Sequence, residues 1–188
     1  DHRDLHSFPT RRSSDLDGDS ACILSKFVHQ KRSLARDEEK KDQIVQMAEN
    51  VDPLDRAPKL ETSFQTHRAQ EEDIGQLCEL YKKVFKTYPT PIFEEEYVKE
   101  CMENDVYFTV IKHHNQIVSA ASADVFSQFN SAEITDCATY PEYRGKGLLS
   151  SIIFDLEERM EGKVRSLFSL TRAVSTGMNV AISKLGYE

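Results

Sequence analysis

Residues 141–149 read PEYRGKGLL, a loop with two glycines that decides how the rest of the chain is interpreted. Apolar spacing predicts a strand over 132–139 before the loop and an amphipathic helix over 148–161 after it. The other predicted elements are helices over 71–88, 93–104 and 177–185 and strands over 106–112, 117–126 and 165–171. Strands joined first by turns and then by helices predict an α+β fold, a mixed α/β layer structure.

The loop has the features of a phosphate-binding site. Gly145 and Gly147 let the backbone approach a ligand closely, and the unpaired amides and dipole of the following helix favour an anion. Arg144 and Lys146 add positive charge. A kinase-type P-loop is disfavoured because no Ser or Thr follows the Gly-Lys pair. A glycine-containing turn before an ordinary helix is the alternative.

This loop resembles the signature Gln/Arg-x-x-Gly-x-Gly/Ala of the GNAT acetyltransferase superfamily. Arg144 and Gly147 match it, whereas Leu149 departs from its last position. The resemblance implies a GNAT acyl-CoA N-acyltransferase fold, a central and mostly antiparallel sheet flanked by helices, with acetyl-CoA as cosubstrate. It also implies a set of cofactor-binding residues: Cys137, Ala138 and Thr139 on the strand and Arg144, Gly145, Lys146, Gly147, Leu148 and Leu149 in the loop.

Four segments carry a narrower resemblance, to β-lysine N6-acetyltransferases. They are YPTPI at 88–92, AEITD at 132–136, ATYPEYRGKG at 138–147 and RAVSTGMN at 172–179. The resemblance implies transfer of an acetyl group from acetyl-CoA to the N6 amine of β-lysine, which makes the compatible solute Nε-acetyl-β-lysine. The alternatives are a GNAT enzyme for another small amine or a protein lysine, and a non-catalytic acyl-CoA-binding module.

Amine acetylation needs a base, and Glu133 and Asp136 are the candidates on the strand that leads into the loop. The two lie three residues apart, on opposite faces of a regular strand, so we expect only one to face the cleft. Many GNAT enzymes use a tyrosine of the last helix as general acid, but this chain has Ile182 there. The remaining candidates are water and three tyrosines, Tyr140, Tyr143 and Tyr187.

Four residues are candidates for binding the acceptor: Tyr88, Arg172, Ser175 and Asn179. Arg172 follows a predicted strand near the site and can pair bidentately with a substrate carboxylate, although a surface salt bridge explains it equally well. Tyr88 lines the acceptor pocket or simply packs. Ser175 and Asn179 also fit a helix cap and a surface amide.

The composition limits the partners. The formal net charge is −8, from 32 acidic and 24 basic residues, which argues against nucleic acid and anionic membranes as partners. The charge is compatible with a small-molecule amine. The four cysteines form no C-x-x-C pair, so no metal site is predicted and buried thiols in a reducing cytoplasm are favoured. A homodimer is compatible with these features.

The N-terminal residues suggest a foreign segment. Residues 1–16, DHRDLHSFPTRRSSDL, fit codon by codon the translation of a common sequencing-adapter oligonucleotide, so they are excluded from the fold. Residues 17–63 are predicted to be a helical extension and linker, with a helix inside 33–50. Residues 64–188 are predicted to be the GNAT domain, without its last strand or strands.

Overall fold

A computed structural model describes residues 15–16, 19–20 and 37–187. The first four of these residues form a short antiparallel pair of strands, β1 (Asp15–Leu16) and β2 (Asp19–Ser20). The foreign segment predicted over residues 1–16 lies outside the described residues except for its last two.

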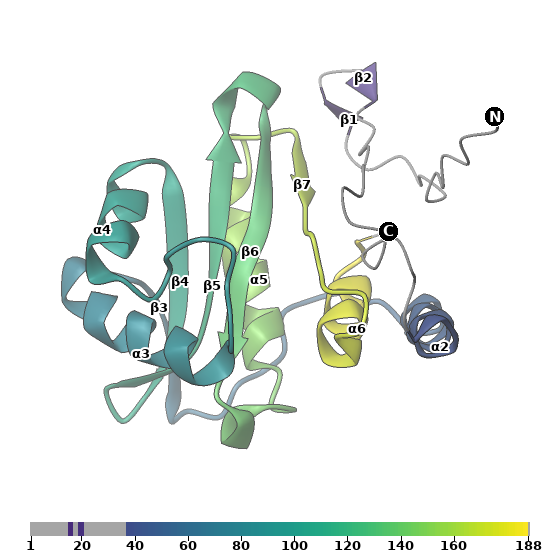
Figure 1. Ribbon diagram of the computed structural model, residues 1–188, viewed down its shortest axis with the longest axis horizontal. Helices are drawn as coiled ribbons and strands as arrows, with labels where there is room; N and C mark the ends of the chain where they lie inside the picture. Colours follow the sequence, from purple (N-terminus) through teal and green to yellow (C-terminus); the bar gives the residue numbers. More distant parts are fainter. Residues whose placement is uncertain (1–14, 17–18, 21–36, 188) are drawn as a thin grey trace, which may run out of the picture.

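Five strands form one sheet in the order β3-β4-β5-β6-β7 (Figure 1). Their bounds are β3 Phe64–Arg68, β4 Val106–His113, β5 Gln116–Phe126, β6 Ser131–Thr139 and β7 Ser166–Phe168. Neighbours from β3 to β6 pair antiparallel, and β7 alone pairs parallel, with β6. The sheet is therefore mostly antiparallel, as predicted.

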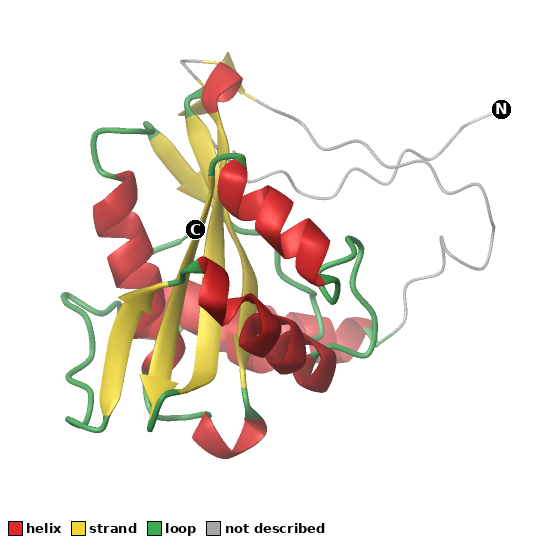
Figure 2. Cartoon of the chain, turned by 90° about the vertical axis from the view of Figure 1, so that its left-hand side faces the viewer, coloured by secondary structure: helices red, strands yellow, loops and turns green. Residues whose placement is uncertain are grey.

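Helices cover both faces of this sheet (Figure 2). Helices α3 Ile74–Val84 and α4 Glu95–Glu103 lie on one face and α5 Leu148–Met160 lies on the other. Helix α6 Thr176–Lys184 packs beside α5, and α2 Glu38–Glu49 packs on α6, away from the sheet (Figure 1). Short 3₁₀ turns occupy Glu71–Asp73, Ser127–Phe129 and Pro141–Tyr143. With the sheet between two helical layers, the predicted α+β class is confirmed.

Two apolar clusters hold the layers together. Leu77, Leu80 and Tyr81 of α3 pack on the face of the sheet that carries Phe108 and Val110. Buried residues of α5 pack on the other face, against Ile111, Val118, Ala121, Ala123, Ala132 and Ile134. Because β5 is covered on both sides, it reads as a nearly continuous run of small and apolar residues without alternation.

The sequence prediction was wrong at β3. No strand was predicted at the start of the domain, but Phe64–Arg68 pairs antiparallel with β4 at the edge of the sheet. Only Phe64 of this strand is buried, so the segment lacks the alternation that identifies a strand. The predicted strand over 165–171 is also shorter, because β7 pairs with β6 only over Ser166–Phe168.

The segment between α2 and β3 packs against helices α5 and α6. Ser183 Oγ of α6 donates to Ala48 O of α2 at 2.6 Å, and Leu54 N donates to Lys184 O at 2.7 Å. Ser151 Oγ of α5 donates to Pro58 O at 3.3 Å. Residues 51–60, here called the strap, therefore run from the end of α6 to the first turns of α5.

Candidate active site

The sheet opens at one edge, between β6 and β7. The two strands pair only from Ser131 with Ser166 to Glu133 with Phe168, after which Ser169 Oγ donates to Ile134 O at 2.7 Å. From Thr135 onward, no strand within residues 37–187 pairs with this side of β6. Unpaired backbone groups at a strand edge can bind an extended ligand.

The loop after β6 leads into an uncapped helix. Helix α5 begins at Leu148, and Gly147 at its N-cap position has φ +75° and makes no side-chain cap. Gly145 has φ +77°. These left-handed conformations suit glycine, and they leave the first amides of a 13-residue helix for an anion.

Contacts with neighbouring strands hold the loop in place. Tyr143 Oη lies 3.2 Å from His113 Nδ1, and both rings pack against Phe64. Arg144 Nε donates to Thr139 O at 3.2 Å, while Lys146 Nζ lies 5.7 Å from the centre of the Phe64 ring. The sequence prediction did not include this role for His113.

Not all of the predicted cofactor-binding side chains are free. Leu148 is buried in the α5 core and Leu149 packs against it, so only their amides can meet a ligand. Ala138 is buried, and Thr139 Oγ1 lies 2.7 Å from Ser119 Oγ. Cys137 packs on the α5 side, where burial raises the pKa of its thiol. The strand can therefore contribute backbone groups rather than a thiolate.

The prediction that Glu133 and Asp136 face opposite sides of the sheet was wrong. The register between β5 and β6 shifts after Ala120, and Asp136 has φ +53°, so β6 carries a bulge there. Ser122 lies opposite Thr135 and donates to Asp136 Oδ2 at 2.6 Å. Because a bulge inserts one residue, it brings Asp136 to the face that Glu133 occupies.

The environment of these two carboxyl groups favours their protonated forms. Burial raises the pKa of Asp136, whereas hydrogen bonds from Ser122 and Tyr88 lower it. Burial also raises the pKa of Glu133, with a further rise from the charges of Asp124 and Asp136. A carboxylate with a raised pKa is a better proton acceptor for an ammonium group.

Two of the predicted acceptor-binding residues lie next to this carboxylate face. Tyr88 is half-buried, and its hydroxyl interacts with the Asp136 carboxylate. Arg172, from the segment after β7, donates through Nη2 to Thr87 O at 2.9 Å. The structure therefore brings Tyr88, Asp136 and Arg172 together from three segments of the chain.

Asn179 and Ser175 instead organise the turn before α6. Asn179 Oδ1 accepts from Thr171 Oγ1 at 2.8 Å, and its Nδ2 donates to Arg172 O and Ser175 O at 3.0 and 2.8 Å. Ser175 occupies the N-cap position of α6, but its side chain makes no cap hydrogen bond. Asn179 therefore fixes the backbone that carries Arg172.

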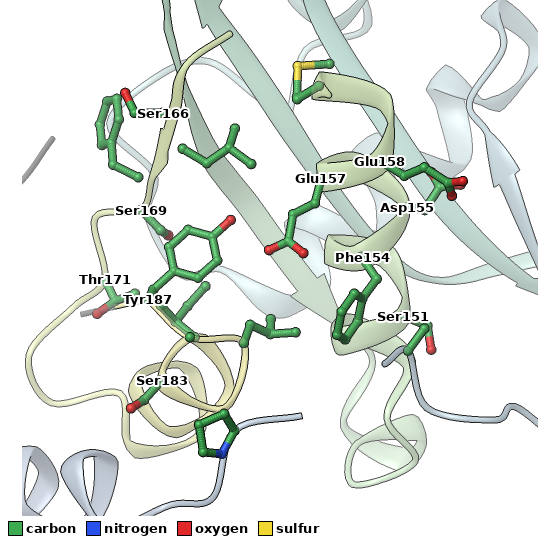
Figure 3. A pocket seen from close by; sticks show the side chains of 18 of the residues that line it. Ser151, Phe154, Asp155, Glu157, Glu158, Ser166, Ser169, Thr171, Ser183 and Tyr187 are labelled. Atoms are coloured by element: carbon green, nitrogen blue, oxygen red, sulfur yellow. The ribbon is translucent and has the colours of Figure 1, made fainter. Parts of the chain in front are cut away.

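A trench of about 2320 Å³ lies on the α5 side of the open edge. It is lined by α5, by β7 and the segment after it, by α6 and by the strap. Figure 3 shows the Tyr187 hydroxyl directed at Glu157 across it. Burial raises the pKa of both groups.

No helix in the described part of the chain is long and apolar enough to cross a membrane. The same residues contain no group of three or more His, Cys, Asp or Glu side chains that could hold a metal ion.

An open sheet edge, a glycine loop at a helix start and a carboxylate face are the arrangement expected of an acyl-CoA-dependent N-acyltransferase. Residues 65–187 match the family model described as an acetyltransferase (GNAT) domain. The chain belongs to the GNAT acetyltransferase family.

Similar proteins include an N-acetyltransferase of Bacillus subtilis, YodP, which is 37% identical over 176 residues, 91% of this chain and 62% of that protein. A β-lysine N(6)-acetyltransferase of Methanosarcina mazei is 32% identical over 166 residues, 88% of this chain and 61% of that protein. The chain thus spans about three fifths of the length of these relatives.

The fold is also similar to the crystal structure of a predicted acetyltransferase from Clostridium acetobutylicum with acetyl-CoA. The TM-score is 0.54 at 18% identity, over 66% of this chain and 90% of that one.

Proposed function

We propose that the protein transfers the acetyl group of acetyl-CoA to a primary amine, and that the acceptor is the N6 amine of β-lysine. The observation that carries the proposal is the bulge at Asp136. It places a carboxylate with a raised pKa beside the part of β6 that has no partner strand.

The donor side of the site fits acetyl-CoA, which supplies an activated acetyl thioester. The first amides of α5 suit its pyrophosphate, with Arg144 and Lys146 exposed beside them. The free edge of β6 around Cys137–Thr139 suits the amides of the pantetheine arm. A similar fold that has been solved with acetyl-CoA supports this choice of donor.

The chemistry on the acceptor side is a balanced proton and acyl transfer. Asp136 or Glu133 takes a proton from the substrate ammonium, so that the nitrogen gains a free electron pair. The carbon–nitrogen bond forms as the carbon–sulfur bond breaks, the nitrogen releases a second proton as it becomes an amide, and the departing thiolate takes up one proton to leave as the free thiol. Tyr143 and Tyr187 already face His113 and Glu157, so neither is assigned as the source of that proton.

The choice of β-lysine draws on a relative and on the acceptor face. A relative that covers 88% of this chain is a β-lysine N(6)-acetyltransferase. Arg172 uses one guanidinium nitrogen for Thr87 O, and its other N–H groups can pair with the carboxylate of an amino acid. The carboxylates of β6 match the ammonium groups. We place this reaction in the cytoplasm, consistent with free thiols at Cys78, Cys101 and Cys137.

The test is an assay of acetyl transfer from acetyl-CoA to β-lysine, α-lysine and spermidine. Release of the free thiol measures the rate, and mass spectrometry identifies the product. We expect turnover of β-lysine to exceed that of the other amines. Asp136→Asn should abolish most of this turnover, whereas the charge-matched Asp42→Asn, on the exposed face of α2, should not. Binding of acetyl-CoA without transfer to any amine would instead indicate an acyl-CoA-binding module.

A further inference from the structure

Three carboxylates gather on the α3 and α4 face of the sheet without a neighbouring cation. Asp124 of β5 lies directly opposite Glu133 of β6, where paired side chains have Cβ atoms about 5 Å apart. Asp136 lies on the same face, where Ser122 of β5 donates to its Oδ2 at 2.6 Å. Among residues 37–187, no lysine or arginine forms a salt bridge with any of the three. Like charges placed directly opposite each other destabilise a sheet, and a cation bound between Asp124 and Glu133 would relieve that repulsion.

A second observation comes from α3. Tyr81 is fully buried, and its hydroxyl has no hydrogen-bond partner in the described part of the chain. Burial and then the charge of Asp136 raise the pKa of Tyr81, so the hydroxyl lies within the field of that carboxylate. The Tyr81 ring stacks on the Phe85 ring with their centroids 6.0 Å apart, and the centroids of the Phe85 and Tyr88 rings are 4.7 Å apart. Buried hydroxyls are normally paired, so this one is available for a hydrogen bond with a polar group that enters beside Asp136.

Rings and carboxylates together form the environment that binds alkylammonium groups, because both attract positive charge. The cluster has two ends. Asp136 lies beside the open edge of β6, and the Asp124–Glu133 pair lies three residues further back. At the rise of a strand, this places the two ends roughly 7 to 10 Å apart.

We infer that Asp124 and Glu133 bind a second ammonium group of the acceptor, so that the site selects short diamines over monoamines. This inference rests on the proposed function, because it takes Asp136 as the partner of the reacting amine. β-Lysine carries its two nitrogens four carbons apart, as putrescine does, and an extended chain of that length fits the spacing of the two ends.

The test compares putrescine with n-butylamine, which differ only in the second amine. Neither has a carboxylate, so Arg172 does not enter the comparison. Binding is measured by calorimetry in the presence of coenzyme A, and acetyl transfer is measured as kcat/KM. We expect the wild-type protein to prefer putrescine at least about tenfold, the effect of one charge-assisted contact.

Asp124→Asn should reduce this preference by about tenfold, because it removes one charge at unchanged size. Asp124→Glu should retain much of the preference, since the charge remains. Asp42→Asn on α2 is the matched control and should leave the preference unchanged. Thermal melts check that each variant folds. Asp124→Asn should melt no lower than wild type, because the substitution removes the repulsion between the charges of Asp124 and Glu133.

Equal binding of the two amines to the wild-type protein would overturn the inference. So would an Asp124→Asn variant that weakens both amines alike, because that indicates a purely structural role. If putrescine is preferred but β-lysine is not acetylated, the proposed acceptor fails and the inference stands. Because calorimetry detects the preference without turnover, an inactive protein still decides the question.

Discussion

Gly147→Ala tests whether the start of α5 is held between the donor loop and the strap. The glycine has φ +75°, and a Cβ added there would lie 2.9 Å from Pro58 Cβ and 3.2 Å from Pro58 Cγ. Gly145 and Gly162 have similar φ values, +77° and +73°, but a Cβ on either meets nothing within 4 Å. These two positions therefore separate backbone strain from the contact with the strap.

The magnitudes follow from the geometry. A left-handed alanine costs about 1–2 kcal/mol, offset in part by a gain of roughly 0.5–1 kcal/mol from the stiffer unfolded chain. Gly145→Ala and Gly162→Ala should each lower the free energy of unfolding by about 1 kcal/mol. Gly147→Ala adds an overpacking cost of roughly 1–3 kcal/mol. In a chain of this size each kcal/mol lowers the Tm by about 2–4 °C.

Thermal melts and calorimetric titration with acetyl-CoA measure both consequences. We expect Gly147→Ala to lose roughly 4–16 °C in Tm and to bind acetyl-CoA about tenfold more weakly, because the first amides of α5 shift. Gly162→Ala lies at the other end of α5 and should bind acetyl-CoA normally. Adding Pro58→Gly to Gly147→Ala should recover part of the stability. A Tm for Gly147→Ala no lower than that of Gly145→Ala would refute the reasoning.

Three further predictions concern the acidic groups. Asp136→Asn should lower kcat by about 10²–10⁴-fold at unchanged acetyl-CoA affinity, and an unchanged kcat in steady-state kinetics would exclude it as the base. Because the folded pKa values of Asp124, Glu133 and Asp136 are raised, their contribution to stability is complete below about pH 4 and is lost as the pH rises through those values. Urea melts should therefore show Asp124→Asn to be more stable than wild type at pH 7 and equal to it at pH 3; a gain that persists at pH 3 would contradict this. Lys112→Met leaves the carboxylate of Asp73, which is only 3% exposed, without its ion partner at 2.6 Å, and it should cost about 3 kcal/mol in denaturant unfolding; a loss near zero would show that Asp73 is satisfied by other groups.

Much of the donor side could be predicted from the sequence because its determinants are local. Two glycines between a strand and an apolar helix specify a loop that ends at a helix start, and α5 begins at Leu148, as predicted. The anchors of that loop could not be predicted. His113 meets Tyr143 only because β4 lies beside the loop in the folded sheet, and nothing local in either segment signals that contact.

The prediction for the acceptor side failed because of one backbone angle. A regular strand would separate Glu133 from Asp136, and the φ of +53° at Asp136 reverses that result. The sequence offers only a weak signal, since Asp tolerates left-handed geometry better than most residues. Asp124 was missed because its importance comes from the register of β5 with β6. The roles of Glu133, Asp136, Tyr88 and Arg172 in the reaction stay predictions.

The contact between Pro58 and Gly147 also bears on how this family can vary. The segment matched by the family model begins at residue 65, yet a residue of the strap leaves room only for hydrogen at the N-cap of α5. A side chain at position 147 is therefore compatible only with a smaller residue or a displaced chain at position 58. Among relatives that keep both segments, the two positions should change together, and their co-variation would record the strap as part of the acetyltransferase fold.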